Sequence, residues 1–386
     1  MHKHIDAKED VSALLKHLES RTDSEAARIR RYMAMPDLSR STGSPLKEIV
    51  DRVLAIPEYS DFYDIETSEI VSTEVTFDLF GFAPDHPARS KSDTYYVDDN
   101  HILRTHTTIM WYYFLRDPEV KAKMERGEPV GCFSYGKVYR KDEIDRRHMN
   151  VFHQMDAWYL APRDKGVLGK ADLERALGNV ARAALGPEVK LHFNEDKFPY
   201  TDPSIELEVE AGDNPAADEK GRIELFGSGV VKGTVLDMLG VDGSKWTGWA
   251  MGPGLERIAL MSLQLPDVRL LWSDDSRVKS QLKLGQKFKE VSKFPSATRD
   301  ISFVVGSEFV VNDYFDLIRD IGGEMIEQVE LKDKYENEAK FGKGKVSYTY
   351  RITYRSLNRT LTSEEIDTIQ KQVYDQTKSV YKAELR

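Results

Sequence analysis

The sequence predicts an α+β protein with a strand-rich central part and a smaller β-α-β-β-α-β domain at its C-terminal end. Two observations predict this class. Between residues 67 and 260, strand-like segments alternate with long loops and a few helices. In the last hundred residues, two amphipathic helices separate strands in the order of the ferredoxin-like fold. A chain of 386 residues suits about two to three domains.

The N-terminal region is expected to be helical. Residues 5–35 read as two short helices, with Ser24 as the cap of the second helix and Pro36 after its end. A polar connector precedes a further helix at residues 46–55, which Pro57 stops.

The central part is predicted from alternating and apolar runs. A stripe of Leu173, Ala176, Leu177 and Val180 indicates a helix at residues 172–185, and the acidic stretch 211–221 indicates a hairpin tip. The expected strands are residues 93–97, 131–139, 152–161, 189–193, 204–210, 222–231 and 247–251.

The C-terminal domain shows the clearest pattern. Five apolar residues from Val346 to Tyr354 alternate with polar ones, which is typical of a half-buried strand. Ser363 is the expected cap of a long helix. The expected order is strand 301–305, helix 311–321, strand 325–335, strand 345–355, helix 364–382 and edge strand 383–386.

Composition excludes several classes of protein. Hydrophobic residues make up 40% of the chain, and no apolar run approaches the ~18 residues of a membrane span. The single cysteine, Cys132, rules out an intrachain disulfide and an all-cysteine metal site. The net charge of −10 argues against a general nucleic-acid coat, but residues 287–386 carry 17 basic and 17 acidic residues. A polyanion would therefore prefer this neutral C-terminal part.

The strongest chemical signal lies in residues 136–156. A predicted strand ends in Arg140, a charged loop follows, and His148 and Phe152 open the next strand. Such a hairpin suits nucleotide binding, because an arginine pairs with phosphate and an aromatic ring stacks on a base. The alternative is a solvated charged hairpin with a core phenylalanine.

A second block runs from Gly248 to Met261. A predicted strand leads into Gly252 and Gly254, and a helix follows with Arg257 in its first turns. Glycines permit close approach of a ligand to the backbone, and the arginine could contact phosphates. The block is neither a P-loop nor a dinucleotide fingerprint.

Together these two blocks resemble motifs 2 and 3 of the class II aminoacyl-tRNA synthetases. The chain is also similar, in collinear order over residues 45–386, to phenylalanyl-tRNA synthetases of the single-chain, mitochondrial type. Further segments carry the resemblance: residues 85–89, 93–96, 104–108, 152–156, 198–204, 224–229, 266–274 and 293–303.

The resemblance implies a class II antiparallel sheet flanked by helices, joined to a ferredoxin-fold anticodon-binding domain. The implied boundaries are an N-terminal helical extension at 1–45, a catalytic core at 46–275, a linker at 276–290 and the anticodon-binding domain at 291–386. The segment matching motif 1, residues 61–84, lacks proline at the position expected for a dimer interface, which favours a monomer.

The implied reaction joins phenylalanine to ATP in the presence of Mg²⁺, and then to tRNA(Phe). Arg140 and Arg257 match the catalytic arginines on the phosphates. His148 matches a residue near the outer phosphates, and Phe152 matches the adenine-stacking ring. Glu224 matches an acid that contacts Mg²⁺ or the adenosine; the alternative is an ordinary strand carboxylate.

The resemblance also implies the amino-acid site. Its polar end is expected to contain Gln154 and Asp156, which alternate on one strand face. Phe198 and Tyr200, expected on one strand face, match the aromatic pair around the substrate ring. The full implied set is His106, Thr108, Trp111, Gln154, Asp156, Phe198, Tyr200, Ala250 and Met251. Trp111, Asp156 and Met251 depart from the usual glutamine, glutamate and aromatic residue, and Tyr200 replaces phenylalanine.

Residues 339–363 contain six basic residues and no acid. Within them, Lys345, Arg351 and Arg355 are expected on the polar face of one strand, and Arg359 follows that strand. We therefore expect this face to bind tRNA phosphates. The alternative is a solvated sheet face.

Two other functions remain open from the sequence: a synthetase of the same subgroup that charges another amino acid, and a non-catalytic RNA-binding paralogue. The complete set of ATP residues argues against the paralogue. The N-terminal residues resemble neither a signal peptide nor a transit peptide, so the expected compartment is the cytoplasm, or the mitochondrial matrix after removal of a presequence.

Overall fold

The computed structural model describes residues 2–214, 217–291 and 294–386. Residues 215–216 of the predicted hairpin tip, and residue 293 of the C-terminal motif, lie outside this description. The chain forms two compact units, which are described separately. The first contains residues 1–140, 151–266 and 282–288; the second contains residues 141–150, 267–281 and 289–386. No helix among the described residues is long and apolar enough to span a membrane.

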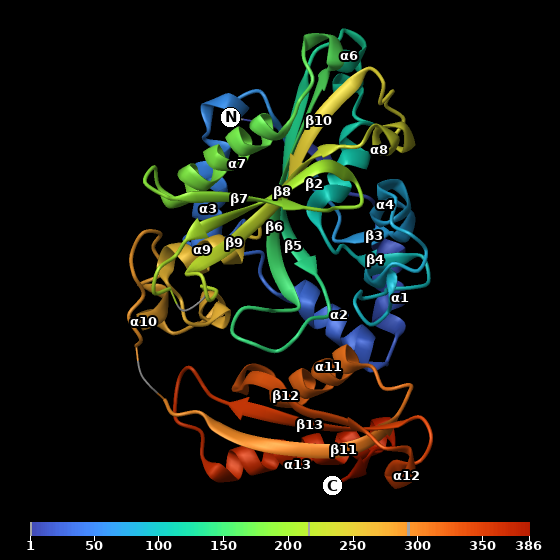
Figure 1. Cartoon of the computed structure of the whole chain (residues 1–386), viewed down its shortest axis with the longest axis vertical. Coiled ribbons are helices and arrows are strands. Elements are labelled where there is room, and N and C mark those ends of the chain that lie inside the picture. Colours follow the sequence, from blue (N-terminus) through green and yellow to red (C-terminus); the bar gives the residue numbers. More distant parts are fainter. Residues whose placement is uncertain (1, 215–216, 292–293) are drawn as a thin grey trace. The chain divides into compact units, whose positions relative to one another are not determined.

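The first unit is built on an eight-stranded sheet in the order β1-β2-β5-β6-β10-β9-β8-β7 (Figure 1). Apart from the parallel pairs β1–β2 and β2–β5, its neighbours are antiparallel. The strands are β1 (Lys3–Ala7), β2 (Tyr63–Thr67), β5 (Val130–Tyr139), β6 (Val151–Pro162), β7 (Leu191–Asp196), β8 (Thr201–Glu210), β9 (Arg222–Val231) and β10 (Trp246–Met251). A separate two-stranded antiparallel sheet pairs β3 (Ile70–Ser72) with β4 (His101–Leu103).

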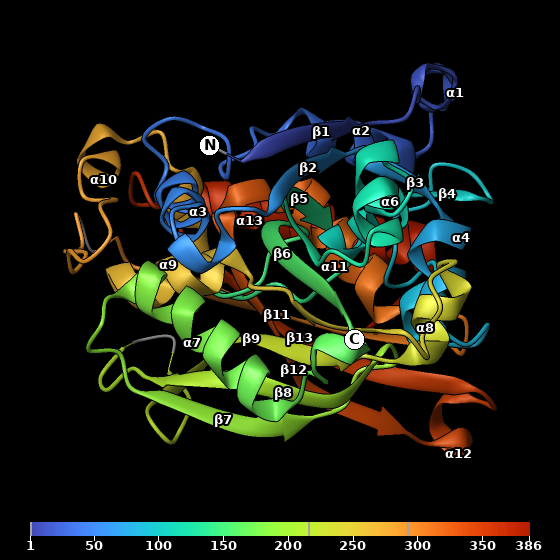
Figure 2. The same ribbon diagram turned by 90° about the horizontal axis from the view of Figure 1, so that it is seen from above.

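Helices cover both faces of this sheet, so β5 is buried at all ten positions. On one face, α3 (Pro45–Leu54), α7 (Lys170–Leu185) and α9 (Leu255–Leu263) pack against one another, and Figure 2 shows α7 lying along β8 and β9. The other face carries a core that includes Trp111 and Trp158. The remaining helices are α1 (Ser12–Ser20), α2 (Ser24–Ala34), α4 (Thr73–Thr76), α5 (Met110–Phe114), α6 (Pro118–Glu125) and α8 (Gly233–Met238).

The second unit confirms the ferredoxin-like prediction. Its antiparallel sheet has the order β12-β13-β11-β14, and α11 and α13 pack together beside it. Phe303, Tyr314, Tyr350 and Ile352 lie in its core. The elements are α10 (Ser276–Lys279), β11 (Ala297–Gly306), α11 (Val311–Gly322), β12 (Ile326–Glu336), α12 (Glu338–Phe341), β13 (Lys345–Tyr354), α13 (Ser363–Tyr381) and β14 (Glu384–Leu385).

Several local predictions are wrong. Residues 5–7, which were predicted as helix, belong to strand β1 because they pair with β2, and residues 93–97 form no strand, since Tyr96 makes only an isolated bridge to Ile102. The cap of α2 is Asp23, whose carboxylate accepts the Ala26 N–H at 2.9 Å. Thr362, in a capping box with Glu365, caps α13 in place of the predicted Ser363. In each cap a neighbouring side chain competes successfully for the same free backbone N–H groups.

Candidate active site

Two of the three expected ATP residues of the first hairpin, Arg140 and Phe152, lie together. Arg140 follows the last residue of β5, and its Nε donates to the Thr105 carbonyl oxygen at 2.9 Å. The guanidinium carbon lies 5.2 Å from the centroid of the Phe152 ring, near the start of β6. This hydrogen bond and cation–π contact hold the arginine beside an aromatic ring that a purine base could use for stacking.

A second pair of expected ATP residues, Arg257 and Glu224, connects the motif 3 helix α9 to the neighbouring strand β9. Arg257 lies in the first turn of α9, and its NH1 is 2.9 Å from a carboxylate oxygen of Glu224. Both side chains are about half exposed, at 45% and 47%. The structure therefore brings together the two residues that the resemblance assigns to the phosphates and to the metal or adenosine.

Glu224 also meets the requirement of an expected Mg²⁺ site. Mg²⁺ commonly binds one or two carboxylates together with substrate phosphates and water. Burial first, and then the charge of Glu224, raises the pKa of the Glu206 carboxyl, so a second carboxylate lies nearby. Among the described residues, no cluster of three or more His, Cys, Asp or Glu side chains could hold a metal ion. Glu224 alone fits Mg²⁺ only where ATP phosphates and water supply the other ligands.

The polar end of the expected amino-acid site centres on Asp156, which is buried on β6. The Thr107 hydroxyl donates a short hydrogen bond to the Asp156 carboxylate, and the Thr108 hydroxyl lies 3.3 Å from the same oxygen. Burial raises the pKa of Asp156 to about 7, against the opposing effects of these hydroxyls and of Arg140. Sequence reasoning missed Thr107, although it stands inside the 104–108 segment.

Two further features complete this polar end. Both ring nitrogens of His106 are buried, and desolvation, followed by repulsion from Arg140, lowers its pKa to about 3. His106 is therefore neutral at physiological pH. A Cβ atom on Gly252 would come within 2.6 Å of an oxygen of Asp156 and of the Gln154 amide nitrogen, so any residue other than glycine would displace these two side chains.

The aromatic part of the site is organised around Trp111. Its ring is fully buried and stacks on Trp158, with centroids 4.5 Å apart and an angle of 6° between the planes. Tyr200 meets Trp111 edge-on at 6.1 Å. Trp158 was missed by sequence reasoning, because a buried tryptophan on a strand looks like any core residue. Ala250 and Met251 at the end of β10 are also buried.

The prediction that Phe198 and Tyr200 share a strand face is wrong. Both precede β8 and lie in the connection from β7, with Pro199 and Tyr200 in a turn. Their rings nevertheless stack with centroids 6.1 Å apart. A Cβ on Gly227 would lie 2.4 Å from the Phe198 ring, so the glycine makes room for this ring.

His148 lies in residues 141–150, the loop between β5 and β6, which belongs to the second unit. Its Nδ1 is 2.9 Å from the Asp145 carboxylate. The loop is held within that unit by the bond of Asn150 to Asp316 at 2.9 Å and by the ion pair of Arg146 with Glu327. No pattern in the sequence indicates that residues 141–150 group with the C-terminal domain.

Each basic residue expected to bind tRNA has a carboxylate partner in the second unit. Arg351 makes two 2.8 Å hydrogen bonds to Asp300, its neighbour across the β11–β13 ladder. Lys345 pairs with Glu384, Arg355 with Glu327 and Arg359 with Glu365. Arg355 follows the last residue of β13 rather than lying in the strand. Phosphate would therefore have to join or replace existing ion pairs.

Comparison with known families agrees with this geometry. The family model described as "tRNA synthetases class II core domain (F)" matches residues 32–282, and the one described as "Ferredoxin-fold anticodon binding domain" matches residues 292–386. The chain thus belongs to the class II aminoacyl-tRNA synthetases.

Curated relatives define the group more narrowly. The chain is 35% identical to the chloroplastic/mitochondrial phenylalanine--tRNA ligase of Arabidopsis thaliana, over 85% of this chain and 73% of the relative. It is 31% identical to the probable mitochondrial enzyme of Drosophila melanogaster, over 84% and 79% of the two chains. It is also 31% identical to the mitochondrial enzyme of Saccharomyces cerevisiae, over 82% and 81%. The chain belongs to the phenylalanine--tRNA ligase family.

Proposed function

We propose that this chain activates phenylalanine with ATP and transfers it to tRNA(Phe). The observation that carries the proposal is the clustering, on one sheet, of two arginine sites and the Asp156 end of the amino-acid site. Phenylalanine-dependent exchange of pyrophosphate into ATP tests it directly. If another of the twenty amino acids drove exchange better, the alternative substrate assignment would replace this one.

The chemistry requires positioning and charge neutralisation rather than a protein nucleophile. The substrate carboxylate attacks the α-phosphate of ATP, and pyrophosphate leaves from the opposite side. Arg140 holds the carboxylate against the α-phosphate, while Phe152 stacks on adenine. Arg257 binds the outer phosphates, a role that the resemblance also implies for His148, and Glu224 would hold Mg²⁺, which would neutralise phosphate charge. A hydroxyl of the terminal adenosine of tRNA then attacks the adenylate carbonyl, which forms the aminoacyl ester and releases AMP.

The amino-acid side of the proposal predicts a pH dependence. The ammonium group of phenylalanine pairs with the ionised form of Asp156, whose pKa burial raises to about 7. We therefore expect phenylalanine affinity to fall by about tenfold per pH unit below that pKa. Asp156→Asn cannot ionise and should bind more weakly with no such slope. Calorimetric titration on both sides of pH 7 measures this affinity. If the affinity of Asp156→Asn for phenylalanine still fell with decreasing pH, the prediction would be contradicted.

The C-terminal domain is proposed as the anticodon-binding part. Replacing Lys345, Arg351 and Arg355 with alanine should weaken tRNA(Phe) binding and flatten its salt dependence by ~0.7–0.9 log unit per lost phosphate contact. The control is replacement of Lys371 and Lys378 with alanine, because both side chains are exposed on α13. Filter binding over a range of salt concentrations measures both effects. Equal slopes for the triple variant and the wild type would exclude this strand as the RNA surface.

We also propose that the enzyme is a monomer. Support comes from the motif 1 segment, which lacks proline at the expected position, and from β1, which occupies the edge of the sheet beside β2. Light scattering should give about the chain mass of 44.2 kDa. A mass twice as large would overturn the proposal.

For the compartment, we propose the mitochondrial matrix. The names of the insect and yeast relatives place those enzymes in mitochondria, which favours the matrix over the cytoplasm. Cell fractionation with an antibody to the chain tests this, and recovery in the cytosolic fraction alone would contradict it.

A further inference from the structure

The strand β6 presents different chemistry on its two faces. Gln154 and Asp156 face the expected amino-acid site, and His153 points to the opposite face, where its side chain is fully buried. A buried histidine requires partners for its nitrogen atoms.

One partner of His153 belongs to motif 3. The two carboxylate oxygens of Glu256 each lie 2.9 Å from the backbone nitrogen of His153, and one of them lies 2.7 Å from its Nδ1. Glu256 is buried in the first turn of α9 and directly precedes Arg257. The backbone supports the same junction, since the Met155 N–H donates to the Pro253 carbonyl at 2.9 Å.

The other partner belongs to the N-terminal region. The Leu38 N–H donates to Nε2 of His153 at 2.9 Å, and the Asp37 carboxylate lies 3.4 Å from the same nitrogen. Because the Leu38 N–H can only donate, Nε2 is the acceptor, and because the Glu256 carboxylate can only accept, Nδ1 carries the hydrogen. The two contacts therefore select one tautomer of the ring.

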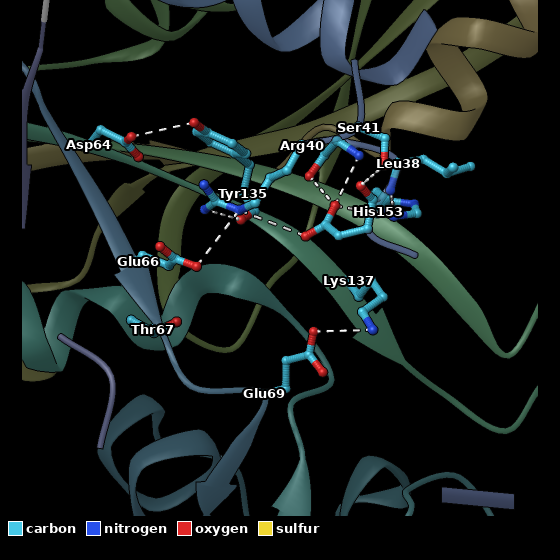
Figure 3. A network of polar contacts seen from close by, with 12 residues as sticks. Leu38, Arg40, Ser41, Asp64, Glu66, Thr67, Glu69, Tyr135, Lys137 and His153 are labelled. Carbon is cyan, nitrogen blue, oxygen red and sulfur yellow. Dashed lines mark hydrogen bonds and ion pairs between the residues drawn. The ribbon is translucent and has the colours of Figure 1, made fainter. Parts of the chain in front are cut away.

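Two more side chains connect the same N-terminal segment to β5, and Figure 3 shows Arg40 beside Tyr135 and Lys137 paired with Glu69. Lys137, almost fully buried, donates to the carbonyl oxygens of Met33 and Met35 at 2.7 and 2.8 Å, and its ammonium lies 3.3 Å from Glu69. Positive charge is favourable at this C-terminal end of α2. Arg40 donates to the Tyr135 carbonyl and lies over that ring at 4.2 Å.

We propose that His153 is a positioning residue that connects the 33–41 segment, β6 and the start of α9, and thereby fixes the spacing of the two phosphate-binding arginines. Arg140 lies three residues beyond Lys137 on β5, and Arg257 lies one residue beyond Glu256. Neither arginine contacts His153 in the hydrogen bonds described, so the histidine acts through Glu256 and the backbone. This inference rests on the ATP roles proposed above for Arg140 and Arg257.

Leu38 offers a clean way to test the connection. The Arg40 N–H bonds to the Asp37 carbonyl, which places Leu38 at the second position of a turn, where proline is well tolerated. Leu38→Pro therefore removes the N–H that donates to His153 and the leucine side chain. Leu38→Ala keeps that N–H and is the matched control. His153→Asn retains a short donor toward Glu256 but removes the acceptor for Leu38.

The measurement is steady-state ATP–pyrophosphate exchange with the full chain, varying ATP and phenylalanine separately, together with thermal unfolding. We expect Leu38→Pro and His153→Asn to raise KM for ATP by about fivefold or more and to lower kcat, while KM for phenylalanine stays within about twofold. Leu38→Ala should match the wild type. If His153→Asn does not fold, the two Leu38 variants decide.

Other outcomes overturn the inference. A lower melting temperature with unchanged KM for ATP would make the contact merely structural, and parallel rises in both KM values would mean general damage. Kinetics of Leu38→Pro equal to those of Leu38→Ala would also exclude the proposed role. Failure of the proposed function is seen separately, because the wild type would then show no phenylalanine-dependent exchange.

Discussion

Replacing Arg140 or Arg257 with alanine is expected to lower phenylalanine-dependent ATP–pyrophosphate exchange by roughly 10²–10³-fold or more. Each arginine contributes charge where negative charge accumulates on the phosphates, and loss of such a preorganised contact costs about 3–4 kcal/mol of transition-state stabilisation. Arg257 is held by Glu224 at 2.9 Å, and Arg140 by the Thr105 carbonyl, so both are oriented before ATP binds.

The lysine variants at the same positions separate charge from shape. Lysine keeps the positive charge but cannot form the planar two-point contact of a guanidinium, so we expect Arg140→Lys and Arg257→Lys to recover only part of the rate. Circular dichroism controls for folding. Exchange near the wild-type rate in either alanine variant would exclude that arginine from the ATP site.

Gly252→Ala is expected to have the second large effect. The added Cβ would lie 2.6 Å from both Asp156 Oδ1 and Gln154 Nε2, so these side chains must move by about 1 Å to reach ordinary contact distance. A displacement of that size in substrate-positioning groups costs about 10²-fold. We expect that loss in kcat/KM for phenylalanine, with a much smaller change in KM for ATP.

Gly254→Ala is the matched control, since Gly254 lies two residues away in the same loop. A Cβ there would meet nothing within 4 Å, and its φ of −75° suits alanine. Exchange kinetics with each substrate varied in turn distinguish the two variants. Similar losses in both would attribute the effect to loop stiffness rather than to the amino-acid site.

Much of the strand-rich core could be predicted from the sequence. Strand β9 was predicted with the bounds found, and β5 and β6 within one residue, because long runs of apolar and alternating residues mark strands with little ambiguity. Short elements were less predictable. Strand β1 exists only because it pairs with β2, about sixty residues away, and its own residues carry no strong preference.

The residues of the candidate site also divide into those that the sequence predicts and those that only the fold reveals. Asp156 and Gln154 were predicted on one face of a strand, and they lie there. Thr107 was not predicted, because neighbouring threonines in one segment look alike until the fold shows which hydroxyl meets the carboxylate. The sequence also suggested free cations for tRNA, whereas the folded domain supplies an acid for Arg351 from the neighbouring strand.

By itself, the sequence determined the class of the protein, the order of its two domains and the identity of the motif residues, because local periodicity and motif spacing are written along the chain. Only the tertiary structure decided which residues touch. His153 meets Leu38 and Glu256 across 115 and 103 positions of sequence, and residues 141–150 group with the C-terminal domain. Such contacts depend on the packing of whole elements, and hydrogen bonds between distant segments leave no periodic trace in the sequence.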